Sequence, residues 1–158
     1  MFIAVLILTL SMAMLFFYLQ TICLRILRRE FDHDYFLPIV NANRLEFPAV
    51  RKAVEEFDAP IDYGRFCMML KCDFLALSYL LKNAGNEDRK YSSQDRLLIV
   101  YFHLTYLVLR VRHLLRLDEK LPILRLTSIL QFFGNIIGLR VTSTRFRDIS
   151  ASDYLLTL

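Results

Sequence analysis

The sequence predicts an all-α protein with a single N-terminal transmembrane helix followed by a compact bundle of three long helices and one short helix. The first observation behind this prediction is that no charged side chain precedes Arg25. The second is the scarcity of Gly and Pro, with four residues each, which favours long helices over a turn-rich sheet protein. The third is composition: 56% of the residues are hydrophobic and 23% are charged, which excludes a disordered chain and a polytopic transporter.

The stretch from Phe2 to Leu24 has the length of a membrane-spanning helix. A helix that rises about 1.5 Å per residue needs about 20 apolar residues to cross a hydrocarbon core about 30 Å thick. A cleaved signal peptide would carry basic residues ahead of the apolar run, and Ser11-Met12-Ala13 is a poor cleavage site inside it. A helix of this length in the core of a soluble domain would usually carry charged residues on at least one face, and this segment carries none. Residues 1–24 are therefore predicted to be a retained membrane anchor.

The basic residues nearest this anchor predict its orientation. Arg25, Arg28 and Arg29 all lie on its C-terminal flank. Because such residues favour the cytoplasmic side of a membrane, we expect the N-terminus outside and residues 25–158 in the cytoplasm. The prediction is a single-pass membrane protein.

The next segment, residues 25–46, is predicted to be a juxtamembrane loop because it contains Pro38 and shows no sustained hydrophobic period. A helical domain is predicted at 47–141, beginning with the short helix at 49–57. A polar C-terminal tail is predicted at 142–158.

The first long helix of this domain is predicted at 62–83, with Asp62 as its N-terminal cap. Its polar residues fall along one narrow stripe and nearly all its other residues are apolar, so the helix is predicted to be buried on most sides. The stripe consists of Gly64, Lys71, Ser78 and Lys82.

Two further long helices are predicted at 93–117 and 123–141. The first begins at Ser92 or Ser93, followed by Asp95, which is typical of a helix N-terminus. The second has an Arg within its apolar run, which favours packing inside the bundle over a second membrane span.

His103 and His113 are the candidate cofactor ligands, to a haem or within a quinone pocket. On one helix they lie about 80° apart around the axis and about 15 Å apart along it, so they cannot ligate one ion together. Asp32-His33-Asp34 is a small charged candidate site in the loop. No zinc, nucleotide-binding or nucleophile motif is present in the sequence, and we expect no resident cofactor.

Asp73 lies within the apolar surface of the predicted helix at 62–83. A buried carboxylate is costly unless it is paired. A structural ion pair with Arg65, Arg110 or Arg112 is therefore predicted.

The candidate surfaces for partners or lipid are basic or rich in small residues. Nine basic residues lie between 96 and 147, against two acidic ones. Such a surface suits anionic lipid headgroups or an acidic partner, whereas nucleic acid is not expected because no recognised binding module is present. A GxxxG pair on the last helix would let another backbone approach closely. The residues singled out are Arg110, Arg112, Arg116, Gly134 and Gly138.

These features predict a non-catalytic accessory subunit of a membrane complex, which binds other membrane-protein subunits through its helical domain. Its apolar surface is hard to bury within about 130 residues alone. One alternative is a subunit of a redox complex with a histidine ligand to haem or a quinone-pocket contact. Another is a membrane-surface enzyme that acts on lipids, with Asp32 and His33 near the headgroups.

Overall fold

The computed structural model describes residues 1–29, 31, 34–56, 62–83 and 92–156, with side chains described as far as Thr142. Within this part the chain is all-α, without strands, so the predicted fold class is confirmed. The helices are α1 (Phe2–Leu27), α2 (Phe36–Asn43), α3 (Phe47–Glu56), α4 (Tyr63–Asn83), α5 (Ser93–Leu114) and α6 (Lys120–Leu156).

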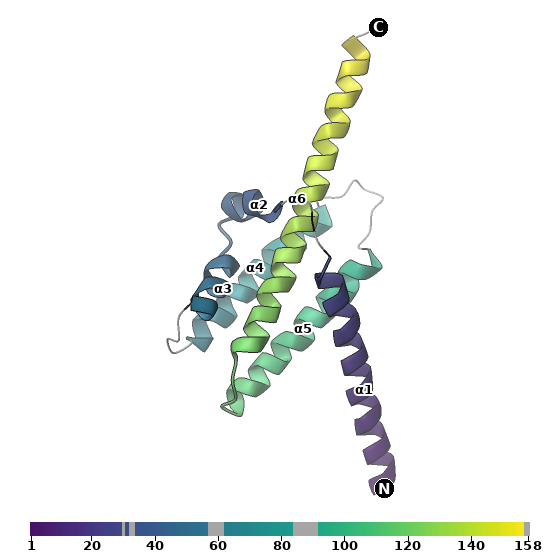
Figure 1. Cartoon of the computed structure of the whole chain (residues 1–158), viewed down its shortest axis with the longest axis vertical. Helices are drawn as coiled ribbons and strands as arrows, with labels where there is room; N and C mark the ends of the chain where they lie inside the picture. The colour runs from purple at the N-terminus through teal and green to yellow at the C-terminus, as the bar shows by residue number, and fades with distance from the viewer. Residues whose placement is uncertain (30, 32–33, 57–61, 84–91, 157–158) are drawn as a thin grey trace.

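Helix α6 is the centre of the bundle. Helices α2, α3, α4 and α5 all pack against it, and α1 contacts α5 and α6 through its C-terminal end (Figure 1). The apolar side chains that α6 buries against its neighbours are Ile123, Leu126, Ile129, Leu130, Phe132, Phe133 and Ile137.

Helices α4 and α5 pack antiparallel through aromatic side chains. The rings of Phe74 and Phe102 stack with their centroids 3.9 Å apart, and Tyr63 at the start of α4 stacks on His113 near the end of α5 at 3.6 Å. Helix α5 begins with a capping box in which the side chain of Ser92 and that of Asp95 each accept the other residue's backbone N–H.

The predicted juxtamembrane loop is wrong over residues 36–43, where the chain forms α2. Pro38 is the third residue of α2, a position at which the missing N–H would have had no intrahelical acceptor. The helix ends at Asn43, and the C-cap residue Arg44 has a left-handed backbone (φ 51°) that turns the chain sharply into α3.

The predicted end of the last long helix at residue 141 is also wrong, because α6 continues to Leu156, so that residues 142–156 of the predicted tail are helical. Residues 142–156 contain no Gly or Pro that would end a helix. This extension projects beyond the bundle at the end of the molecule opposite to the N-terminus (Figure 1).

Candidate functional site

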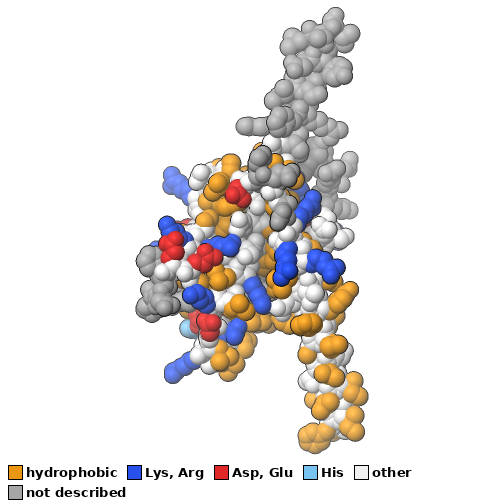
Figure 2. All heavy atoms as spheres, viewed as in Figure 1, with side chains coloured by type: hydrophobic (Ala, Val, Ile, Leu, Met, Phe, Trp, Pro, Cys, Tyr) orange, Lys and Arg blue, Asp and Glu red, His pale blue; other side chains and the backbone are white. Residues whose placement is uncertain are grey.

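The N-terminal half of α1 projects from the bundle, and within the described part of the chain nothing packs against it. From Phe2 to Leu15 every large apolar side chain is exposed, and the lowest exposed fraction is the 59% of Val5 (Figure 2). In water such a surface would cost several kcal/mol of unfavourable hydration. Helix α1 is the most hydrophobic of three helical segments in the described chain that are long and apolar enough to cross a membrane, the others being Ser93–Leu114 and Lys120–Thr142.

The C-terminal end of α1 is fixed to the bundle. Cys23 is completely buried there. The side-chain oxygen of Gln20, in the amide orientation that satisfies both of its polar atoms, accepts hydrogen bonds of 3.0 and 3.1 Å from the guanidinium of Arg125 on α6. The flanking residues Arg25, Arg28 and Arg29 lie beyond this junction and are exposed.

Helix α4 leaves one apolar face open, which corrects the prediction that it is buried on most sides. Met68 is 71% exposed, Leu75 59% and Tyr79 68%, and Cys72 between them is exposed as well. Successive steps of four, three and four residues place these four side chains on one line along the helix. We call them the α4 stripe. The exposed basic residues Arg65, Lys71 and Lys82 flank it.

The three predicted contact arginines lie at the C-terminal end of α5. Arg110 is exposed with its guanidinium carbon 5.5 Å from the centre of the Tyr106 ring. Arg112 is half-buried in the last turn, and Arg116 is exposed in the connection to α6.

The structure places His103 and His113 in separate surroundings. Nδ1 of His103 is hydrogen-bonded to the backbone oxygen of Ile99 at 2.8 Å, within α5 itself. Nδ1 of His113 lies 2.6 Å from Oε1 of Glu119, and its ring stacks on Tyr63. Each ring therefore uses one nitrogen in an internal contact.

Asp73 is buried, as predicted, but its predicted arginine partner is wrong. Oδ2 of Asp73 accepts the backbone N–H groups of Glu46 at 2.8 Å and Phe47 at 2.6 Å, and in the described part of the chain it has no ion pair with Arg. These donors stand at the N-terminus of α3, where N–H groups lack helical acceptors and the helix dipole favours a negative charge. The carboxyl group therefore joins α4 to the start of α3.

Burial raises the pKa of Asp73, and the two backbone donors only partly oppose this effect. The folded protein therefore binds the proton of the Asp73 carboxyl group more tightly than the unfolded chain does. The stabilisation that comes from this tighter binding is complete below the unfolded pKa of about 3.9, and it is lost as pH rises through the folded pKa.

For Asp73→Asn we therefore expect the free energy of unfolding of the wild type, minus that of the variant, to fall as pH rises from about 3 to about 7. Denaturant titrations of both proteins in detergent at several pH values measure this difference. A difference that increases with pH would contradict the raised pKa.

A buried ion pair that sequence reasoning missed joins α5 to α6. Nη2 of Arg140 lies 2.8 Å from Oδ2 of Asp95, whose side chain is 2% exposed. Oδ2 also accepts the backbone N–H of Ser92 at 3.1 Å. The sequence identified Asp95 as the acidic residue at the predicted helix start. It did not indicate that Arg140, 45 residues later, is its partner.

The GxxxG face of α6 is occupied by the chain itself, which corrects the prediction of a partner or lipid contact there. Gly134 and Gly138 are buried beneath the start of α2. A Cβ at Gly134 would lie 2.8 Å from Cβ of Phe36, and one at Gly138 would collide with the backbone carbonyl of Tyr35. The backbone N–H of Phe36 donates to Oδ1 of Asn135 at 2.9 Å in the same contact.

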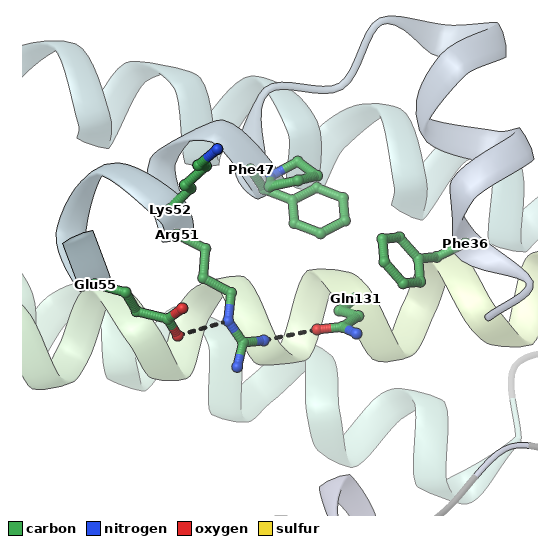
Figure 3. A pocket seen from close by; sticks show the side chains of 7 residues that line it. Phe36, Phe47, Arg51, Lys52, Glu55 and Gln131 are labelled. Carbon is green, nitrogen blue, oxygen red and sulfur yellow. Dashed lines mark hydrogen bonds and ion pairs between the residues drawn. The ribbon is translucent and has the colours of Figure 1, made fainter.

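A pocket of about 340 Å³ opens between α2, α3 and α6 (Figure 3). Arg51 crosses it, with Nε donating to Glu55 at 2.9 Å and Nη1 to Gln131 at 2.7 Å. The hydrogen bond to Gln131 holds α3 against α6, and the ion pair with Glu55 compensates the arginine charge. The lining residues are Phe36, Phe47, Pro48, Arg51, Lys52, Glu55 and Gln131.

Within the described residues, no group of three or more His, Cys, Asp or Glu side chains is placed to hold a metal ion. Asp32 and His33, the residues of the lipid-enzyme alternative, lie outside the described residues. Comparison with models of known protein families, with curated proteins and with solved structures finds no match to this chain.

Proposed function

We propose that this protein is a non-catalytic, single-pass subunit of a membrane complex. Helix α1 anchors it with the N-terminus outside, and the bundle holds a partner subunit at the cytoplasmic face. The uncovered apolar half of α1 supports the anchor, and Arg25, Arg28 and Arg29 at its inner end support the orientation.

The α4 stripe is the observation that carries the partner role. A helix that lies on a partner typically presents anchors at steps of three, four and seven residues. Met68, Leu75 and Tyr79 have this spacing and remain largely exposed after the bundle has formed its core. Exposed apolar residues aligned in this way are typical of protein contacts.

The basic residues beside the stripe favour an acidic partner. Arg65, Lys71 and Lys82 lie on its two sides, and no acidic residue of α4 flanks it. A complementary partner is an amphipathic helix whose apolar stripe is bordered by Asp and Glu. The groups with catalytic potential support a structural role for the bundle, because Asp73, Asp95 and His113 are all engaged in internal contacts.

Cys72 provides a direct test because it lies in the stripe and is exposed, whereas Cys23 and Cys67 are buried. Burial also raises the pKa of the Cys67 thiol, which further lowers its reactivity. The chain purified in detergent without its partner should therefore take up a thiol-reactive photo-crosslinker selectively at Cys72, before it is returned to native membranes. Illumination should give one discrete adduct with a different protein, and the attached peptide should be an acidic amphipathic helix.

The matched control is Cys72→Ser combined with Lys52→Cys, which moves the reactive thiol to an exposed position on α3. We expect no discrete adduct from this variant. Crosslinks from Cys72 to lipid alone, to a second copy of this chain, or to the same proteins as the control would contradict the proposal.

A further inference from the structure

We infer that the turn between α5 and α6 dips into the lipid bilayer beside the anchor and forms a second membrane contact. The contact consists of Leu114, Leu115, Leu117 and Leu121 with the basic residues Arg112, Arg116 and Lys120, which we call the α5–α6 tip. The inference rests on the proposed membrane anchoring by α1 but not on the proposed partner.

The tip is apolar where a water-facing turn would be polar. Leu114 is 81% exposed, Leu115 61%, Leu117 51% and Leu121 49%. Connections between helices usually carry Gly, Asn, Asp and Ser, whose side chains are compatible with water. Four exposed leucines within eight residues are typical of a segment that is buried in another medium.

The tip and the projecting half of α1 lie toward the same end of the molecule (Figure 1). The hydrogen bonds between Gln20 and Arg125 fix the register between α1 and α6. An anchor of about 20 residues that begins at Phe2 brings Gln20 to the boundary of the hydrocarbon core. Lys120 precedes Arg125 by five residues, or about 7.5 Å of helix, so the tip reaches past that boundary. Apolar groups that lie at a membrane interface are typically buried about 5–10 Å into the boundary between headgroups and acyl chains.

The charges around the leucines fit anionic headgroups. Arg116 is exposed at the turn, and Arg112 and Lys120 are half-exposed on either side of it. Of the two acidic residues nearby, Glu119 lies 2.6 Å from His113, and Asp118 accepts the backbone N–H of Lys120 at 3.0 Å. Apolar side chains ringed by Arg and Lys are the pattern of a segment held at the surface of an anionic leaflet.

Two backbone hydrogen bonds close the turn at the tip. The N–H of Leu117 donates to the carbonyl of Arg112 at 2.9 Å, and that of Arg116 donates to His113 at 3.0 Å, which is the double closure of a Schellman motif. Arg116 adopts the left-handed conformation (φ 54°) that Gly would take at lower cost. The turn thus presents its leucines and Arg116 in a fixed arrangement.

Depth-dependent quenching tests the inference in the full chain. In a Cys72→Ser background, where the remaining Cys23 and Cys67 are buried, one exposed cysteine from Leu115→Cys, Leu8→Cys or Lys52→Cys carries an environment-sensitive fluorophore. Each protein is reconstituted into vesicles of phosphatidylcholine and phosphatidylglycerol that contain spin-labelled lipids. All three positions are exposed in the folded protein, so labelling leaves the core intact.

We expect blue-shifted emission and quenching by shallow spin labels at position 115, quenching by deep labels at position 8, and neither effect at position 52. Adding Arg116→Glu and Lys120→Glu should reduce quenching at position 115 without changing quenching at position 8.

If position 8 is quenched while position 115 behaves like position 52, the proposed anchor is retained and the inference about the tip is overturned. A blue shift at position 115 without lipid quenching would place the tip against protein and would also overturn it. An unquenched position 8 would contradict the anchor itself.

Discussion

Arg140→Leu is expected to destabilise the bundle by about 3–5 kcal/mol, because it leaves the buried carboxylate of Asp95 without its charged partner. Asp95 is almost completely buried, and its ion pair of 2.8 Å joins the start of α5 to α6. Nη1 of Arg140 also donates to the carbonyl of Leu81, at the end of α4, at 3.5 Å. Thermal unfolding in detergent should show the loss as a drop in melting temperature of about 10 °C.

The double variant Asp95→Asn/Arg140→Leu is the control for this prediction. Removing the carboxylate charge should recover part of the stability, because most of the cost arises from leaving one charge unpaired and buried. The double variant should therefore be more stable than Arg140→Leu alone. Additive losses from the two substitutions would contradict a coupled pair.

Gly138→Ala is expected to destabilise the protein by about 1–3 kcal/mol even though Ala favours helices by about 1 kcal/mol. The new Cβ would collide with the carbonyl oxygen of Tyr35 and lie 2.7 Å from its Cβ. A backbone group cannot rotate away as a flexible side chain can, so the start of α2 must move. This shift would weaken the hydrogen bond from the Phe36 N–H to Asn135. Hydrogen exchange at Phe36 should therefore become faster.

Gly64→Ala is the matched control, because among the described residues the Cβ that it adds near the start of α4 meets only Oδ1 of Asp62, at 3.8 Å. It should leave stability unchanged or slightly higher and should not alter exchange at Phe36. Equal effects of the two substitutions would show that α2 does not depend on the close approach at Gly138.

The sequence predicted the features that depend on local patterns. The uncharged run before Arg25 predicted α1, and the helix predicted at 62–83 matches α4 within one residue. Asp95 marked the start of α5 because a capping box involves neighbours along the chain. The GxxxG pattern predicted a close backbone approach, although not that α2 would be the neighbour.

The missed features depend on contacts between distant residues. Asp73 accepts N–H groups that lie 26 and 27 residues earlier, and no hydrophobic period contains that information. Helix α2 is short and weakly patterned, so its packing on α6 determines it more than its own sequence does. The open face of α4 was missed because apolar residues for the core and for a partner have the same pattern in a sequence.

The central claim is that the α4 stripe holds a partner helix at the membrane, and crosslinking from Cys72 in native membranes tests it most directly. The comparison is between the wild type and Lys71→Glu/Lys82→Glu, since these exposed substitutions leave the core intact. We predict one discrete adduct with an acidic amphipathic helix of another protein, and its loss when the two lysines are reversed in charge. An adduct that persists unchanged in the charge-reversed variant, or crosslinks to lipid alone in the wild type, would contradict this account.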